Sequence, residues 1–301
     1  MVDCLGLGIA PADILMGIES YPKPGLKIDA VNHAVQGGGP VPTAMVTLAR
    51  LGMKPALLAV VGDDLFGKFV INELKKERVD TSLIIEKKQP TAVASGWFEK
   101  DTGRRTIVLE LNIVLQAKDI KLEALPRARC VHLDGRYLPA CTKLAKWAKK
   151  NKIPIVLDVG SMRNDVSELL PLVDHMVCAD AYAMPFTQTK TAQKAIEKLR
   201  EYCNGTIVVT LGTRGSIGYA NDEGFIEQKA YMVKTIDTTG AGDVYHGAYI
   251  FGLLNGYDLK ERMRFGAIAA AIKCTRPGGR LGIPTLKQVR DFIRKAAENH
   301  A

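Results

Sequence analysis

The sequence predicts an α/β fold, with a central and mostly parallel sheet, helices on both of its faces and a small β lid. Apolar segments of strand length alternate with amphipathic segments of helical length along most of the 301 residues, as in parallel sheets that are covered on both faces. Two β-rich stretches, at about 13–36 and about 91–111, interrupt this alternation. We interpret them as parts of one lid, inserted into a single α/β domain that spans 1–301.

The first fifty residues contain two candidate ligand-binding corners. Val2 to Ala10 is predicted to be a buried strand, with Asp13 just after it. The mixed stretch from Glu19 to Gln36 predicts short strands that project from the body. Gly37-Gly38-Gly39-Pro40 then opens a helix that ends near Gly52.

A strand-helix unit and a hairpin follow. Pro55 to Val61 is predicted to be a buried strand, and Phe66, Val70 and Leu74 are spaced as on a helix. Thr91 to Leu111 is β-rich and is predicted to form a hairpin that turns at Asp101-Thr102-Gly103.

The second half continues the alternation. Helices are predicted at Ala140–Lys150 and Ala192–Cys203, between the apolar strands Cys130–Leu133, Ile153–Val159, His175–Cys178 and Thr206–Leu211. A strand pair, Ser216–Ala220 and Phe225–Tyr231, turns at 221–224, and the last three helices begin near Ala241, Leu259 and Leu286.

Composition excludes several classes of protein. The apolar content of 47% and the charged content of 24% are those of a folded globular protein, not of a disordered or coiled-coil chain. The net charge of +9 favours an anionic ligand. Basic residues occur as short pairs such as Lys75-Lys76, without interleaved aromatic residues, so we expect no nucleic-acid partner.

The six cysteines are scattered and form no C-x-x-C motif. This pattern predicts free, buried thiols in a reducing cytoplasm. The N-terminus has no basic leader, and no run of about eighteen apolar residues occurs, so we expect neither export nor a membrane partner.

The chemistry is concentrated in Asp237-Thr238-Thr239-Gly240-Ala241-Gly242-Asp243, which is followed at once by an uncharged run of helical length. The two glycines permit turn conformations and remove the Cβ atoms that would keep a ligand from the backbone amides. A helix that begins near Ala241 would offer unpaired N–H groups and its positive dipole end to an anion such as phosphate. A carboxylate beside that anion indicates phosphoryl transfer, with one Asp as the proton acceptor.

The chain resembles the ribokinase-like, or PfkB, carbohydrate kinases over nearly its whole length. Residues 237–243 look like the C-terminal signature of that family, and by this resemblance Gly240, Ala241 and Gly242 form the anion hole and Asp243 is the catalytic base. Gly38-Gly39 through Gly52, and then 61–67, are similar to the N-terminal signature and its following segment. Thr210, Gly212 and Gly215 resemble the nucleotide-binding turn, and 273–284 (KCTRPGGRLGIP), with Gly279, the loop that closes the adenine and monovalent-cation sites.

The resemblance also implies substrate-binding residues. Asp13, Gly38 and Gly39 fall where family members contact sugar hydroxyls, and Thr43 stands where many have Asn. Comparison with the sulfofructose kinases and ketohexokinases of this family implies that Lys27, Asn112 and Arg136 contact the substrate. A Lys and an Arg that converge on one end of a sugar would suit an anionic group.

The metal site departs from the family pattern. The usual N-x-x-E near the metal-bound phosphates is replaced by Asp180-Ala181-Tyr182-Ala183. Asp180 and Asp237 are therefore the candidates to organise Mg²⁺ through water, and Asp237 is also a candidate for a K⁺ site. ATP and Mg²⁺ are the implied cofactors, and a homodimer formed through the lid strands is an open alternative to a monomer.

The sequence thus predicts ATP-dependent phosphorylation of a hydroxymethyl group on a ketose-like sugar or an anionic sugar derivative. The start of the helix is expected to keep Asp243 ionised. Two alternatives remain, a nucleoside kinase with stacking aromatic residues such as Trp97 or Tyr137 in its pocket, and a sensor that has lost catalysis. His132 and His246 lack metal-site spacing and are interpreted as structural.

Overall fold

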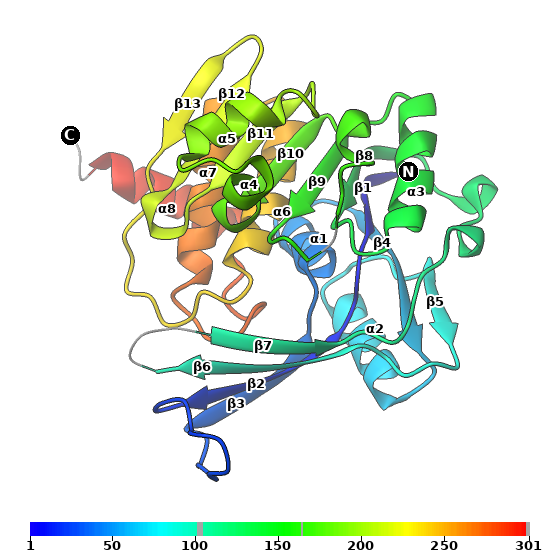
Figure 1. Cartoon of the computed structure of the whole chain (residues 1–301), viewed down its shortest axis with the longest axis vertical. Helices are drawn as coiled ribbons and strands as arrows, with labels where there is room; N and C mark the ends of the chain where they lie inside the picture. Colours follow the sequence, from blue (N-terminus) through cyan, green and yellow to red (C-terminus); the bar gives the residue numbers. More distant parts are fainter. Residues whose placement is uncertain (101–104, 164, 299–301) are drawn as a thin grey trace.

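The computed structural model describes residues 1–100, 105–163 and 165–298 of the chain, in which two sheets of unequal size form the framework (Figure 1). The hairpin turn predicted at 101–103 lies outside the described residues. Both predicted layers, a large helix-covered sheet and a small separate one, are present.

The large sheet has nine strands in the order β13-β12-β11-β10-β9-β8-β1-β4-β5. Its seven strands from β11 to β5 pair in parallel, and β12 and β13 form an antiparallel extension at one edge. In chain order the strands are β1 (Val2–Leu7), β4 (Pro55–Gly62), β5 (Ile84–Lys87), β8 (Ala128–Leu133), β9 (Ile155–Val159), β10 (His175–Ala179), β11 (Thr206–Thr210), β12 (Ser216–Ala220) and β13 (Gly224–Gln228).

Helices cover both faces of this sheet, as the alternation predicted (Figure 1). One face packs against α3 (Leu138–Lys150), α4 (Asp180–Thr187) and α5 (Ala192–Leu199). The other packs against α1 (Pro40–Arg50), α2 (Leu65–Lys76), α6 (Ala241–Leu254), α7 (Leu259–Lys273) and α8 (Leu286–Glu298).

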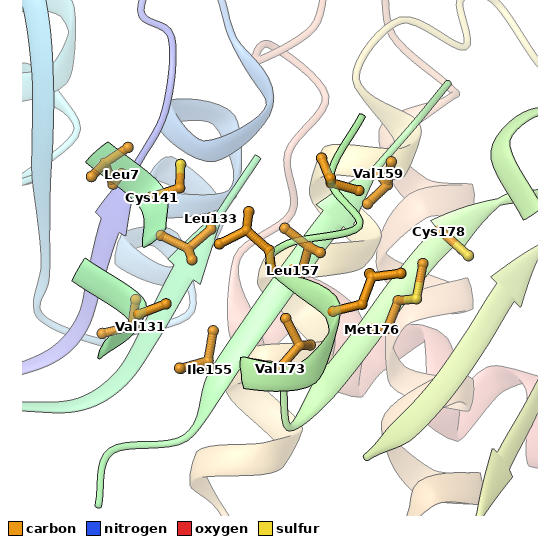
Figure 2. Close-up of a cluster of buried hydrophobic side chains, with 14 of the residues drawn as sticks. Leu7, Val131, Leu133, Cys141, Ile155, Leu157, Val159, Val173, Met176 and Cys178 are labelled. Carbon is orange, nitrogen blue, oxygen red and sulfur yellow. The ribbon is translucent and has the colours of Figure 1, made fainter. Parts of the chain in front are cut away.

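The strands sort their side chains between these two faces because successive residues of a strand point to opposite sides. Figure 2 shows Val131 and Leu133 of β8, Ile155 and Leu157 of β9 and Met176 of β10 on the α3 side. The intervening residues point to the α6 side, where Cys130, Val156 and Val177 join the second core. His132 and Asp158 occupy positions of this second set, and both are almost fully buried.

The small sheet forms the lid and has the order β3-β2-β6-β7. Its strands are β2 (Ala12–Ile18), β3 (Asn32–Gly37), β6 (Val93–Glu99) and β7 (Arg105–Glu110). Strands β2 and β6 pair in parallel, whereas β2–β3 and β6–β7 are antiparallel. The sheet lies to one side of the large sheet, at the bottom of the view in Figure 1.

Local sequence signals explain several helix ends. Asp64 caps α2 by accepting a hydrogen bond from the Gly67 amide at 2.7 Å, and its other oxygen accepts one from the Thr91 amide at 2.8 Å. This carboxylate therefore also fixes the start of the lid hairpin. Asp258 and Glu261 form a capping box at the start of α7.

Some predicted boundaries were wrong. The first lid strand begins at Ala12, only five residues after β1 ends, and no strand occurs in the stretch 19–31, where Leu26, Ile28 and Val31 are exposed. Strand β5 and helix α4 were not predicted, because β5 has only four residues and α4 contains Pro185. Within the described ranges, every helix falls short of the length and apolarity that crossing a bilayer requires.

Candidate active site

A cleft of about 390 Å³ lies between the lid and the large sheet. On the sheet side it is lined by residues at the carboxyl ends of parallel strands, including Ile9 after β1, Asp134 after β8, Val159 of β9 and Thr210 of β11. The lid contributes inward-facing residues of β2, β6 and β7, namely Asp13, Leu15, Ala94, Ile107 and Leu109. Ligands bind at this end of open α/β sheets, because the loops there present free polar groups.

The glycine turn before α6 opens into this cleft. Gly240 caps the helix with a positive φ of 75°, a conformation that favours glycine. A Cβ atom at Gly240 would come within 2.8 Å of the Gly279 carbonyl oxygen, whereas one at Gly242 would meet nothing. Among the described residues, no acceptor is bonded to the amides of Gly242 and Asp243, so these two N–H groups are available to an anion in the cleft.

Asp243 follows Gly242 in the first turn of α6 and lines the same cleft. Burial raises the pKa of its carboxyl, and the positive charges of His246, Arg105, Lys273 and Arg280, in that order, lower it. The net direction is upward. We expected the start of the helix to keep this carboxylate ionised, and burial acts against that effect.

Asp13 faces Asp243 across the cleft, from the first residues of β2. Burial raises the pKa of Asp13 to about 7, against the charge of Arg280, and the negative charge of Asp243 adds to the increase. The two carboxylates therefore lie in each other's field. A side chain at Gly38 would overlap the Asp13 carboxylate, which explains the glycine at this position.

Asp237 holds the turn and the C-terminal loop together. One carboxylate oxygen accepts a hydrogen bond from the Thr239 amide at 2.7 Å, and the other accepts one from the Gly278 amide at 2.8 Å. The fully buried ammonium group of Lys273 donates to the Asp237 carbonyl at 2.8 Å. Asp237 is only 3% exposed and does not line the cleft.

Three hydrogen bonds between residues distant in sequence join the lid and its base to this turn and to the C-terminal loop. Arg105 of β7 donates to the Thr238 carbonyl at 2.9 Å. Gln36 at the end of β3 accepts from the Gly279 amide at 3.1 Å, and the buried Arg280 donates to the Gly38 carbonyl at 2.9 Å. Movement of the lid strands would therefore be transmitted to the glycine turn and to the C-terminal loop.

Three of the expected nucleotide-binding residues lie at the end of β11 and in the turn after it. Thr210 lines the cleft, and Gly212 and Gly215 form the turn after β11, both with positive φ. A Cβ atom at Gly215 would overlap the Gln228 carbonyl, whereas the position of a Cβ at Gly212 is open. Gly279 lies against Gly240.

The expected substrate-binding residues are only partly brought together. Asp13, Gly39 and Arg136 line the cleft, and Gly38 contacts Asp13. Thr43 is buried in α1, where its carbonyl accepts from the Thr47 hydroxyl. Lys27 is exposed in the stretch 19–31, and the exposed Asn112 bonds Glu110, so neither is among the residues that line the cleft.

Several cleft residues were missed by the sequence analysis. Arg105, Arg163, Asp134 and Asp158 all line the cleft. The Asp134 carboxylate accepts from the amides of Ile9 and Arg136, both at 3.0 Å, and burial raises its pKa to about 7. The signal that could have identified Asp134 and Asp158 is their place at the carboxyl ends of β8 and β9.

No fully formed metal site is present in the part of the chain that the structure describes, in the sense of three or more acidic, His or Cys side chains gathered around one point. Asp180 begins α4 and is ion-paired with Arg214 at 2.7 Å.

Trp97 is on the outer face of the lid, and Tyr137 bonds the Ile113 carbonyl at 3.3 Å. No Phe, Tyr or Trp is among the described residues that line the cleft, which disfavours a pocket for a nucleoside base.

Comparisons with known proteins agree with this geometry. The sequence pattern of the family described as pfkB family carbohydrate kinase matches residues 18–286. The chain is 28% identical to the ribokinase of Haemophilus influenzae, over 96% of this chain and 98% of the relative. It is 26% identical to a 5-dehydro-2-deoxygluconokinase of Clostridium perfringens, over 88% and 85%.

Solved structures extend the agreement to the fold. A putative ribokinase from Agrobacterium tumefaciens superposes with a TM-score of 0.86 and 25% identity, covering 99% of both chains. The ribokinase of Arabidopsis thaliana, solved with ribose and ATP, superposes with a TM-score of 0.84 and 26% identity, covering 97% of this chain and 99% of that one. The two-sheet architecture is thus that of solved kinase structures.

Proposed function

Because the chain belongs to the pfkB family of carbohydrate kinases, we propose that its cleft transfers the γ-phosphoryl group of ATP to a hydroxymethyl group of a sugar, with Asp243 as the base. The observation that carries this assignment is that the Asp243 carboxylate shares one cleft with Asp13 and with the amides of Gly242 and Asp243, which have no acceptor among the described residues. A proton acceptor, an anion-binding turn and a sugar-binding carboxylate are what phosphoryl transfer to an alcohol requires.

In this mechanism, Asp13 bonds the sugar hydroxyls and orients the reacting one toward Asp243. Asp243 accepts the proton of that hydroxyl as its oxygen attacks the γ-phosphorus. The amides at the start of α6 stabilise the negative charge on the phosphoryl oxygens, because they are fixed before the reaction by Gly240 and Asp237. The lid, tied to the turn through Arg105, excludes water from the cleft.

Mg²⁺ would supply additional positive charge to the phosphates. It usually binds through phosphate oxygens, waters and one or two carboxylates, which fits a site that offers few acidic side chains. Asp180 is our candidate to bond a water of the ion. Both carboxylate oxygens of Asp237 already accept backbone amides, so we assign Asp237 to the turn. The Asp237 carbonyl accepts a hydrogen bond from the Lys273 ammonium group. A requirement for K⁺ stays a prediction, and assays in K⁺ and in tetramethylammonium salts test it.

We propose further that the sugar carries an anionic group. Arg136 and Arg163 both line the cleft beside the ends of β8 and β9. Burial lowers the pKa of Arg136, and the nearby charge of Arg163 lowers it further, against the charge of Asp134. Two guanidinium groups so placed favour a carboxylate, since each can bond two of its oxygens. The similarity to 5-dehydro-2-deoxygluconokinases supports this class of substrate.

The test of the substrate class is a coupled ADP-release assay with neutral ketoses and pentoses, aldonic and 2-keto acid sugars, and nucleosides. We expect the lowest KM for an acid sugar. Arg136→Met and Arg163→Met should each raise this KM by about tenfold, the factor for an interaction of about 1.4 kcal/mol. Arg290→Met, which changes an exposed arginine on α8, is the matched control. Equal KM values for acid and neutral sugars in all variants would refute the proposal.

The test of the base is Asp243→Asn. We expect kcat to decrease by about 10²–10⁴-fold, the range typical for loss of a general base, while ATP binding measured by calorimetry is retained. Asp222→Asn, in the exposed β12–β13 turn, is the control for removal of one charge. Near-normal turnover of Asp243→Asn would exclude the assigned role, and an absence of turnover with every sugar in the parent protein would favour the sensor.

We also propose that two copies pair through their lids. The outer face of the small sheet exposes apolar side chains, among them Met16, Val35, Trp97 and Val108, and an apolar face of this kind marks an interface. Light scattering after size exclusion should give a dimer, and Val35→Glu with Val108→Glu should give a monomer. Met232→Glu, an exposed site outside the lid, should leave the dimer unchanged. A monomeric parent protein would exclude this pairing.

The six cysteines are all buried free thiols. Burial raises the pKa of most of these thiols, including Cys141 and Cys178, which keeps them unreactive. We therefore place the protein in a reducing compartment, the cytoplasm.

A further inference from the structure

His246 lies directly beneath the candidate active site. It follows Asp243 by three residues on α6, so the two side chains lie on the same face of the helix. The ring is only 4% exposed, and it lines the bottom of the cleft where α6 packs over β8, β9 and β10. From the sequence alone, this residue was interpreted as structural.

Both ring nitrogens of His246 face hydrogen-bond acceptors. Nδ1 is 2.7 Å from the Gly242 carbonyl oxygen, and Nε2 is 3.0 Å from the Val177 carbonyl oxygen. A backbone carbonyl can only accept, and a neutral imidazole has only one N–H to donate. The neutral ring would therefore hold one nitrogen lone pair against a carbonyl oxygen in a buried site. The imidazolium has two N–H groups and satisfies both acceptors.

The surroundings also favour one positive charge. Asp158 of β9, which is 5% exposed, has a carboxylate oxygen 3.4 Å from Nδ1. Burial raises the pKa of Asp158 to about 6, against the charge of His246, and the charge of Asp243 adds to the increase. His132 of β8 stacks on His246 with 5.8 Å between ring centroids, and burial, helped by the His246 charge, lowers its pKa to about 3. Burial therefore holds His132 neutral, and His246 lies between the buried carboxylate of Asp158 and the half-buried carboxylate of Asp243.

Other titratable groups also lie near this cluster. Tyr245 contacts the His246 ring edge, and Asp134 and Cys178 lie within the field of Asp158. Asp243 also feels the cations of the lid and the C-terminal segment, Arg105, Lys273 and Arg280. Of the charges that act on Asp243, that of His246 has the largest effect.

We propose that His246 is a positioning residue whose ring carries a positive charge at neutral pH, and that this charge, balanced by Asp158, keeps the Asp243 carboxylate ionised and ready to accept a proton. The inference rests on the proposed role of Asp243. It solves the problem that burial creates for the base, because a buried carboxylate needs a nearby cation to stay ionised. The bond to the Gly242 carbonyl also places the charge within the turn that binds the anion.

The first test measures the charge directly and does not depend on activity. In the protein labelled with ¹⁵N at histidine, NMR at pH 7 should show both ring nitrogens of His246 as protonated N–H, while His132 shows one protonated nitrogen. The variants His246→Asn and His132→Asn assign the two sets of signals. A single neutral tautomer of His246 at pH 7 would overturn the proposal.

The second test measures the pH profile of kcat/KM with the best sugar. In His246→Asn, the loss of the cation raises the pKa of Asp243, so the acidic limb should move to higher pH. A shift of about one pH unit means roughly tenfold lower kcat/KM below the limb, with a smaller loss on the plateau. His132→Asn removes a buried but neutral ring on the neighbouring strand, and its limb should coincide with that of the parent.

A merely structural role for His246 would lower kcat/KM equally at all pH values, and a limb that does not move in a folded His246→Asn variant would overturn the proposal. Thermal unfolding establishes that the variants are folded. If the parent protein phosphorylates no sugar, the proposed function fails, but the NMR measurement still decides whether His246 is charged. Failure of the two proposals is thus distinguishable.

Discussion

Replacing Asp237 by Asn should loosen the glycine turn at 237–243 without touching the cleft. The Asp237 carboxylate joins the Thr239 amide at 2.7 Å to the Gly278 amide at 2.8 Å, and it is 3% exposed. Asparagine keeps one acceptor oxygen but turns an NH₂ group toward the other amide. One charge-assisted hydrogen bond is lost and one buried N–H is left without an acceptor, a cost of about 2–4 kcal/mol.

At roughly 2 °C per kcal/mol for a chain of this size, the Tm should decrease by about 4–8 °C. The turn should also move relative to the loop that carries Gly279. Because a misplacement of about 1 Å can cost about 10²-fold in rate, we expect kcat to decrease by about 10–100-fold. Differential scanning fluorimetry and the coupled ADP assay measure the two effects.

Asp80→Asn is the matched control, because Asp80 accepts a backbone amide, that of Ser82, at 2.9 Å but at an exposed site. Its Tm should stay within about 1 °C of the parent value, as is usual for exposed substitutions. A parent-like Tm and kcat in Asp237→Asn would refute our account of the turn. Lost activity with an unchanged Tm would instead assign Asp237 to a bound cation.

Two further predictions concern stability. Gly39→Ala should lower the free energy of unfolding by more than about 2 kcal/mol in urea denaturation, because Gly39 has φ of 91° and an added Cβ would overlap the Ile9 carbonyl. Gly52 has a similar φ of 93°, but an added Cβ there would meet open space, so Gly52→Ala should cost only about 1–2 kcal/mol. Equal losses of unfolding free energy in the two variants would contradict the overlap at Gly39. The pKa of Asp134 is raised from 3.8 to about 7 in the folded protein, so its contribution to stability is present below pH 4 and is lost as pH rises toward 7. Asp134→Asn should therefore reduce the decrease in unfolding free energy between pH 5 and pH 8, by at most about 3 kcal/mol, and parallel curves for both proteins would disprove this.

The sequence alone predicted the elements whose signals are local. The parallel strands β1, β4 and β8 to β11 were recognisable as apolar runs, since both faces of a covered sheet are buried. The turn at 237–243 was recognisable because its glycines permit turn conformations and leave the backbone amides open to a ligand, with a carboxylate at each end. The short strand β5 and the Pro-containing helix α4 carried no such signal, because they are stabilised by neighbours and not by their own composition.

The tertiary structure decided which residues share the cleft and which charges act on Asp243. Gln36 bonds Gly279 across 243 residues of sequence, and Arg105 bonds Thr238 across 133. No local pattern records such contacts, because they exist only once the strands have been ordered in the sheets. His246 is the clearest case. Its spacing from Asp243 was visible in the sequence, but the charge that we propose for it is argued from Asp158 and two carbonyl oxygens that only the folded chain brings to its ring.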